Sequence, residues 1–363
     1  MRSINNIKNI ISVFLCVILV VLNIIACGNI DKVDNNVDNN ENKKVKIVTT
    51  IFPIYDIVRN IVPSDKYDIS MLLDSGIDIH NFQPTVQDMN EIINADIFIY
   101  IGGESDKWVD KVLKSVNNEN LKSINLIENI SHIVKVEEIV EGMEHDHDEH
   151  NEEHHDEHEE DHDEEHHEEN HEHDEEHDHE NDEHIWLSIR NVKEITKFLW
   201  GELVLNKDNI NFINEDVYKN IENNATKYLI RLEELDNKFK NELQNKKYDT
   251  LVFADRFPFR YLCDDYNLKY FAAFSGCSAE SEASFETVAF LAKKVDELNL
   301  PHICAILGST HKIPQTVVNT TKDKNQDIIY FNSMEGISDI NNESINYINI
   351  MEENLDALKK ALN

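Results

Sequence analysis

The stretch "KVKIVTTIFPIYDIVRNIV" (residues 44–62) contains the unit from which the fold is built. Its first half is short and rich in β-branched residues, which is typical of a strand. Its second half begins at Pro53, and proline is favoured in the first turn of a helix because its φ angle is already helical. The stretch therefore predicts a β-strand followed directly by a helix.

The same alternation continues over the next forty residues. It comprises a strand, a loop, a helix and a buried strand, namely "YDISMLL" (67–73), "DSGIDIHNFQP" (74–84), "TVQDMNEIINA" (85–95) and "DIFIYIG" (96–102). The helix opens with Thr85 and Asp88 at the spacing of a capping box, in which each side chain satisfies a backbone N–H of the first turn. Strands that alternate with helices predict a parallel sheet with helical crossovers.

A long helix is predicted over 208–247. Apolar residues recur at steps of three or four from Ile213 to Leu243, and no Gly or Pro interrupts the chain from Asn211 to Lys247. This pattern is one apolar stripe about eight turns long.

A second strand–helix alternation follows over 248–363. Its strands are "TLVFA" (250–254), "LKYFAAF" (268–274), "HICAIL" (302–307) and "DIIYF" (327–331). The sequence therefore predicts an α/β protein of two lobes, 45–200 and 248–363. Each lobe has a mostly parallel sheet flanked by helices, and one long rigid helix joins the lobes.

The N-terminus has the pattern of a secretory signal. Arg2 and Lys8 precede an apolar run that ends at Ile25, and the small residue Ala26 comes before Cys27. We expect a signal peptide over 1–26, with "IIAC" resembling the lipobox of bacterial lipoproteins, so that Cys27 becomes the lipidated first residue. A flexible tether over 27–44 and an extracytoplasmic location follow. The alternative is an uncleaved signal anchor, because the run is nearly long enough to cross a bilayer.

The charge of the chain is concentrated in one tract. The formal net charge is −37, but 24 acidic residues lie between Glu144 and Glu183, so the remainder is only moderately acidic. The same region holds 14 of the 18 histidines when His184 is included. We expect a disordered loop over 144–183, because apolar residues that could offset the entropy of ordering are absent from it. A basic footprint for nucleic acid is missing.

Two interpretations of this tract remain open. A charge run is usually a solvated loop, but solubility alone does not explain so many imidazoles. Many weak imidazole and carboxylate sites would raise the local metal concentration. The tract would then either collect metal for a nearby site or sense its excess.

The cysteines do not predict a disulfide framework. Cys263, Cys277 and Cys304 form an odd set without a CxxC spacing. We expect Cys263 and Cys304 to be small buried hydrophobic residues. Cys277 is a possible soft metal ligand.

Candidate metal ligands follow from the topology. In open parallel sheets, ligands bind beyond the C-terminal ends of the strands. The polar residues predicted at those ends are His80, Asp255, Glu280, Glu282 and His311. The motifs GxSxG and the P-loop are absent from the sequence, so we expect a binding protein and not an enzyme.

Three segments carry a resemblance to a known family. "VTTIFPIYDIVRNIV" (48–62), "DIHNFQPTVQDMNEIINADIFIYIGGESDKWVDKVL" (78–113) and "EHIWLSIRN" (183–191) resemble the metal-specific solute-binding lipoproteins of bacterial ABC importers, the zinc/manganese group. The resemblance extends from about Lys44 onward. A His-rich insertion ending at "HIWL" is, in that family, a feature of zinc binders.

The resemblance implies two α/β lobes with the metal held between them. His80 corresponds to the first ligand of the family and His184 to the second. The third is usually a His opening "H-D-A-F-x-Y". Here "FADRFPFRYL" (253–262) places Ala254 at that position, which makes Asp255 the nearest coordinating residue.

The fourth ligand is less defined in the family. The segment "SGCSAESEASFE" (275–286) corresponds to one that carries a ligand Glu in manganese-type relatives. This makes Glu280 a candidate ligand, with Glu282 as the alternative. A late Asp of some members falls near "YFNSMEG" (330–336), where Asn332 and Ser333 replace it. His311 and Cys277 stay possible ligands, and Asp255 could equally cap a helix or pair with a neighbouring Arg.

These expectations define a function. We predict an extracytoplasmic, membrane-anchored, monomeric lipoprotein that captures Zn(II) in the cleft and delivers it to the permease of an ABC importer. The alternatives are a manganese- or iron-binding component of the same importer class, a surface metal-storage or adhesin lipoprotein, and a metallohydrolase. By affinity alone zinc outcompetes Mn(II) for such nitrogen and oxygen ligands, and the His-rich tract also favours zinc.

Overall fold

The computed structural model describes residues 43–73, 79–116, 118–143, 181–205, 214–278, 282–310 and 312–363. The predicted signal peptide, Cys27, nearly all of the tether and the His-rich loop up to residue 180 lie outside these ranges. Residues from Lys44 onward form one compact unit. Among the described helices, none has the length and apolar character needed to cross a membrane.

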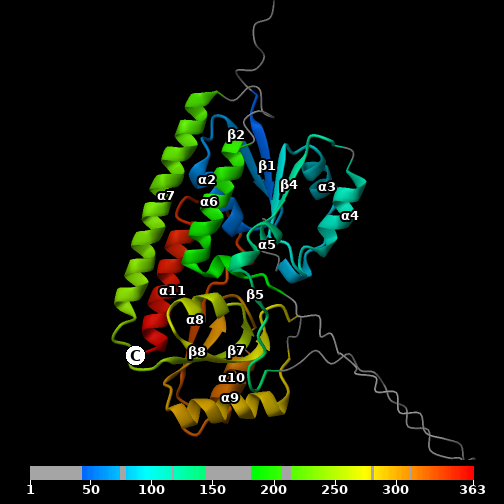
Figure 1. Cartoon of the computed structure of the whole chain (residues 1–363). Helices are drawn as coiled ribbons and strands as arrows, with labels where there is room; N and C mark the ends of the chain where they lie inside the picture. The colour runs from blue at the N-terminus through cyan, green and yellow to red at the C-terminus, as the bar shows by residue number, and fades with distance from the viewer. Residues whose placement is uncertain are drawn as a thin grey trace, which may run out of the picture. The chain divides into compact units, whose positions relative to one another are not determined.

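The first sheet contains four parallel strands in the order β2-β1-β3-β4 (Figure 1). They are β1 (Val45–Thr49), β2 (Tyr67–Met71), β3 (Ile97–Tyr100) and β4 (Lys122–Asn125). The helices that follow these strands are α2 (Phe52–Ile61), α3 (Val86–Ile93), α4 (Lys107–Ser115) and α5 (Leu126–Asn129).

The predicted starts of the first helices are confirmed. Pro53 lies in the first turn of α2, where its missing N–H leaves no helical hydrogen bond unmade. Thr85 and Asp88 form the predicted capping box at α3, with the Thr85 N–H donating to Asp88 Oδ2 at 2.6 Å. These local interactions fix where the chain leaves each strand.

The second sheet also contains four parallel strands, in the order β10-β9-β7-β8. They are β7 (Thr250–Phe257), β8 (Lys269–Ser275), β9 (His302–Ile306) and β10 (Asp327–Phe331). Its helices are α8 (Arg260–Asp265), α9 (Phe285–Leu298), α10 (Lys312–Thr320) and α11 (Tyr347–Ala361). Strand β7 continues past the predicted "TLVFA", with an irregular register between Phe253 and Arg256.

The long helix is α7 (Glu215–Glu242), which begins after the Asn214 cap. Its buried residues include Val217, Ile221, Ala225, Tyr228, Leu232, Leu235 and Phe239, the stripe seen in the sequence. Two helices that the sequence analysis did not define, α6 (Ile189–Leu205) and α11, pack against α7 (Figure 1).

Hydrogen bonds connect the first sheet's helices to the end of the chain. Arg59 on α2 donates to the carbonyls of Ile340 and Ile345, and the Tyr347 N–H donates to Asp56 at 3.0 Å. One apolar core extends across both sheets, and a smaller one lies on the second sheet. The predicted fold class, two parallel-sheet α/β lobes flanked by helices, is confirmed.

Candidate metal centre

Two short segments carry the imidazoles that the sequence pointed to. His80 lies in a 3₁₀ turn, η1 (Ile79–Asn81), in the connection between β2 and α3. His184 caps a second turn, η3 (Ile185–Leu187), immediately after the short strand β6 (Asn181–Asp182), which pairs antiparallel with β5 (Lys135–Val136). The structure brings these residues together, with ring centroids 5.5 Å apart.

A carboxylate from the second sheet completes this group. Glu335, four residues after the end of β10, places its Oε1 atom 3.1 Å from His80 Nε2 and 3.1 Å from His184 Nε2. All three side chains are nearly or fully buried. We call His80, His184 and Glu335 the inner cluster, because its ligand atoms lie within 4.8 Å of one another.

The loop that carries Glu335 is held from two sides. Asn354 on α11 exchanges two hydrogen bonds with the backbone of Asn332, and the Trp186 indole N–H donates to the Ser333 carbonyl at 2.8 Å. Met334 adopts a left-handed backbone with φ of 65°. Trp186 belongs to the same turn as His184, so this hydrogen bond connects the His184 and Glu335 segments.

The hydrogen bonds behind each ring assign its tautomer. Asp182 Oδ1 lies 2.9 Å from His184 Nδ1, and because a carboxylate only accepts, Nδ1 carries a proton. The Ser105 hydroxyl donates to Glu183, and its oxygen lies 2.8 Å from His80 Nδ1 and accepts that N–H. Both Nε2 atoms therefore face the same carboxylate oxygen, Glu335 Oε1, to which they donate when protonated and with which they would share a cation when they carry lone pairs.

Without a cation, the hydrogen bonds between the imidazoles and Glu335 shift the pKa values of both Glu335 and His184. Burial would raise the pKa of Glu335, but hydrogen bonds from His184 and His80 outweigh it and hold the pKa well below its usual value. Burial would lower the pKa of His184, but Asp182 and Glu335 outweigh it and raise the pKa. Arg256 adds positive charge 4.0 Å from Glu335 Oε2.

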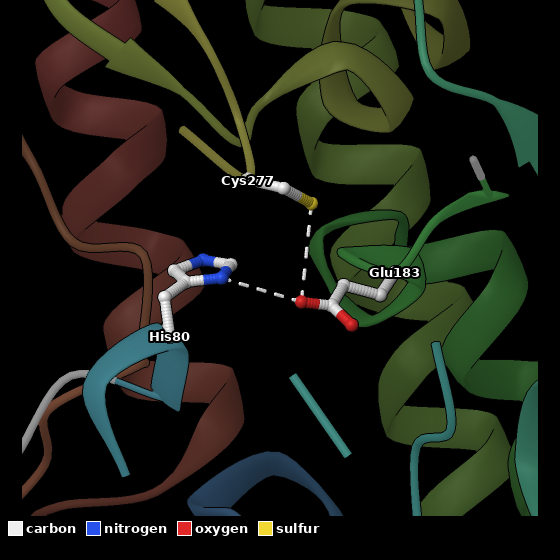
Figure 2. A group of neighbouring side chains, drawn as sticks. All are labelled: His80, Glu183 and Cys277. Atoms are coloured by element: carbon white, nitrogen blue, oxygen red, sulfur yellow. Dashed lines mark hydrogen bonds and ion pairs between the residues drawn. The ribbon is translucent and has the colours of Figure 1, made fainter. Parts of the chain in front are cut away.

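A second group, the outer cluster, consists of His80, Glu183 and Cys277. Glu183 Oε1 lies 3.4 Å from His80 Nδ1 and 3.9 Å from Cys277 Sγ, and Figure 2 shows the three side chains pointing toward one another. Burial raises the pKa of Glu183 more than the two imidazoles and Ser105 lower it. Burial also raises the pKa of the neighbouring Asp106, to about 7, and the charge of Glu183 adds to this rise.

The other predicted ligands are distributed differently. Asp255 joins neither cluster, because β7 runs past it and its carboxylate accepts from the N–H groups of Arg256 and, on β9, Ile306. Glu282 is exposed, while Glu280 and His311 lie outside the described residues. Cys263 and Cys304 are buried free thiols as predicted, and Cys277 is partly exposed.

A cavity of about 320 Å³ adjoins the inner cluster on the side of the second sheet. Ala254, Asp255, Arg256 and Glu335 contribute to its walls. Ala254 itself is fully buried and offers no ligand atom at the position where the family usually has His. Glu335, and not a residue of β7, is the side chain from the second sheet whose carboxylate meets the two imidazoles.

Sequence reasoning missed Glu335 and Glu183. In "YFNSMEG" the position of the late family Asp corresponds to Asn332 and Ser333, but Glu335 in the same segment follows the end of a strand and precedes a glycine. The same topological rule that selected the other candidates applies to this position. Glu183 was counted as part of the acidic tract, and nothing in its local sequence separates it from the preceding carboxylates.

Comparison with known proteins agrees with this geometry. The model of the ZnuA family, the periplasmic component A of zinc-uptake complexes, matches residues 47–361. The high-affinity zinc uptake system protein ZnuA of Bacillus subtilis is 28% identical over 320 residues, covering 88% of each chain. The zinc-binding protein AdcA of Streptococcus pyogenes is 27% identical over 318 residues, which is 87% of this chain but 56% of AdcA.

Solved structures show the same fold. The metal-dependent lipoprotein YcdH of Bacillus subtilis superposes with a TM-score of 0.64 at 23% identity, covering 88% of this chain and all of that one. The Zn(II)-bound ZnuA-like domain of Streptococcus pneumoniae AdcA gives 0.62 at 22%, covering 88% and 99%. The chain thus belongs to the ZnuA family, the periplasmic solute-binding components of zinc-uptake complexes.

Proposed function

We propose that this chain captures Zn(II) at the inner cluster and delivers it to the permease of an ABC importer. The observation that carries the proposal is the convergence of two imidazole Nε2 atoms on one buried carboxylate oxygen, each at 3.1 Å. Family membership and the names of the zinc-binding relatives support zinc as the cargo.

The spacing of the ligand atoms suits zinc. Tetrahedral zinc with ligands at about 2.0 Å separates neighbouring nitrogen and oxygen atoms by about 3.3 Å. The two Nε2–Oε1 distances are close to this value, so an ion would require only small side-chain shifts. Two imidazoles and one carboxylate leave a fourth position for water or a further carboxylate oxygen.

The tautomers favour the same conclusion. Asp182 and Ser105 accept the Nδ1 protons, so in both rings Nε2 is the nitrogen that faces Glu335 and would coordinate an ion. Metal-bound imidazoles usually donate their second N–H in this way, because the bond fixes the ring and increases its basicity. The same set would accept Mn(II) less tightly than Zn(II).

Two charge-removing substitutions test the proposed ligand set. Glu335→Gln keeps the shape of the side chain but removes the anionic ligand, so we expect zinc affinity to fall by about 10–100-fold. Asp255→Asn is the matched control, and we expect little change because Asp255 already bonds to backbone N–H groups. The measurement is competition for Zn(II) against a chromophoric chelator.

The opposite ranking would reject the inner cluster. If Asp255→Asn weakens zinc binding strongly while Glu335→Gln does not, Asp255 is the ligand and the shared carboxylate oxygen has no role in capture. Circular dichroism of both variants separates loss of a ligand from loss of the fold.

We also propose that Cys27 carries a lipid that holds the protein at the membrane surface. The sequence "IIAC" and the name of a relative, the zinc-binding lipoprotein AdcA of Streptococcus pneumoniae, support this. Cells grown with labelled palmitate should label the wild-type protein and not Cys27→Ala. Equal labelling of both proteins would reject the anchor without affecting the metal site.

A further inference from the structure

The outer cluster has the donor types of a metal site and shares only His80 with the inner cluster. Its imidazole nitrogen, carboxylate oxygen and sulfur lie within 4.8 Å of one another and come from three separate segments (Figure 2). Glu183 is fully buried, His80 is nearly so, and Cys277 is partly exposed. Such a mixed set is typical of zinc and of softer divalent ions.

The distances approach those of coordinated ligands. Zinc at about 2.0 Å from nitrogen and oxygen and about 2.3 Å from sulfur would separate N from O by about 3.3 Å and O from S by about 3.5 Å. The observed separations are 3.4 Å for His80 Nδ1 to Glu183 Oε1 and 3.9 Å for Glu183 Oε1 to Cys277 Sγ. A shift of a few tenths of an ångström at the cysteine would close the site.

The surrounding charge favours a cation at this position. Glu183 and Asp106 are two buried carboxyl groups close enough for the charge of one to act on the other. Burying like charges together is costly unless a cation or a proton compensates them. An ion bound by Glu183 would supply this compensation.

We propose that a sulfur-tolerant divalent ion, Zn(II) or Cd(II), binds between His80 Nδ1, Glu183 and the Cys277 thiolate, as an alternative to the inner cluster. A neutral imidazole has one lone pair, so His80 serves one cluster at a time. When Nδ1 coordinates, the ring proton lies on Nε2 and is donated to Glu335 Oε1 at 3.1 Å. The Cys277 thiol releases its proton to solvent as it binds.

One ion would therefore move between two adjacent positions as His80 changes tautomer. The outer position lies beside a partly exposed cysteine, and the inner position is enclosed by three buried side chains. An arriving ion can be held at the outer position before it reaches the inner one. Only the inner position of this scheme rests on the proposed function; the outer cluster is argued from its own contacts.

Cd(II) titration of the full-length chain tests the outer cluster. Cd(II)–thiolate bonds absorb in the ultraviolet, whereas the His-rich tract offers only nitrogen and oxygen ligands and adds no such band. We expect a thiolate band in the wild type and in the control Cys304→Ser, and its reduction by the absorbance of one thiolate in Cys277→Ser. Glu183→Gln should require at least about 10-fold more Cd(II) for the same band.

The wild-type titration alone can overturn the proposal, because it needs no variant to fold. Absence of a thiolate band, or an equal band in Cys277→Ser, excludes a metal–sulfur bond at Cys277. His184→Ala then separates the two positions, since it should keep the band and lose tight zinc binding. Loss of both would make the sulfur a ligand of a single site and overturn the outer cluster, whereas unchanged tight zinc binding would reject the proposed function instead.

Discussion

At the scale of single residues, the metal centre depends on groups that position the imidazoles as much as on the imidazoles. Asp182 and Ser105 contact Nδ1 of each ring, so Nε2 would be the nitrogen that faces an ion in the proposed inner site. Gly276 lies against the His184 ring, where a Cβ would come 2.8 Å from Cε1 and 3.0 Å from Nδ1. The orientation of the His184 ring is therefore fixed by the hydrogen bond with Asp182 on one edge and by the backbone at Gly276 on another.

Substitution of Gly276 by Ala should displace His184. The added methyl cannot be accommodated unless the buried ring moves, and a shift of the ring moves Nε2 away from Glu335. We expect zinc affinity to fall by at least about 10-fold, as for other loss of ligand support, with the fold retained. Isothermal titration calorimetry measures the change.

Gly201→Ala provides the comparison for this substitution. Gly201 lies on α6 with nothing within 4 Å of an added Cβ. Alanine is the better helix former by about 1 kcal/mol, so this variant should bind zinc normally and melt at a slightly higher temperature. Normal zinc binding by Gly276→Ala would show that the ring tolerates the displacement.

The ligands differ in how far they could be predicted from the sequence. His80 and His184 lie in motifs, and the structure brings them together. Glu335 contacts these residues across 255 and 151 positions of sequence, and such a contact leaves no local pattern. Asp255 looked plausible because it follows an apolar strand, but β7 continues beyond it and uses its carboxylate for backbone hydrogen bonds.

At the scale of elements, α7 is attached to its neighbours through a buried carboxylate. Asp236 is fully buried and accepts from Lys240 on the same helix, from Lys193 on α6, and from the Tyr266 hydroxyl at 3.0 Å. Burial would raise the pKa of Asp236, but the bonds from Lys240 and Tyr266 and the charge of Lys193 outweigh it and lower the pKa.

This lowered pKa predicts a pH-dependent stability. A carboxyl group whose pKa is lower in the folded state stabilises the fold above its unfolded pKa of about 3.9, and this stability is lost as the pH falls through the folded value. Asp236→Asn should therefore cost about 1–2 kcal/mol in unfolding free energy at pH 7. The difference from wild type should shrink below about pH 4.

Urea unfolding at several pH values measures this effect. Glu234→Gln removes an exposed carboxylate from the same helix and serves as the control, for which we expect little change. A constant difference between wild type and Asp236→Asn from pH 3 to pH 7 would mean that the ionised carboxylate contributes nothing to stability.

The elements themselves were largely predictable because their signals are local. Strand–helix alternation, the capping box and the α7 stripe depend on residues a few positions apart. Helix α11 was missed because it follows a polar, irregular segment, and its buried face is defined by contacts with α7 and β10.

At the scale of the whole molecule, the metal centre joins segments that lie far apart in the chain. His80 and His184 both precede α7, whereas Glu335 follows the last strand of the second sheet. The hydrogen bonds from Arg59 to Ile340 and Ile345 connect α2 to the segment that follows Glu335. The proposed inner site is therefore linked to the packing of the chain's end through this segment.

The His-rich tract offers a further prediction at this scale. Its residues lie outside the described structure, but the chain resumes at Asn181, two residues before Glu183. A variant lacking residues 144–180 should keep one tight zinc ion, because the inner cluster is intact. It should lose the additional weak zinc ions and grow less well when zinc is scarce, if the tract collects metal.

Zinc titration and growth under chelation measure the two effects separately. Because imidazole must be neutral to bind a metal, the weak sites should disappear as the pH falls through about 6.5. Unchanged zinc stoichiometry together with unchanged growth would leave the tract as a solvated acidic loop.

The left-handed backbone of Met334 bears on how the ion would be released. A non-glycine residue with φ of 65° is held in a conformation that costs on the order of 1 kcal/mol, and it lies one residue before the carboxylate that closes the inner cluster. If withdrawal of Glu335 lets this turn relax, the relief partly offsets the metal–oxygen bond that is broken. A single turn of the chain would then permit both tight binding and rapid release of the ion.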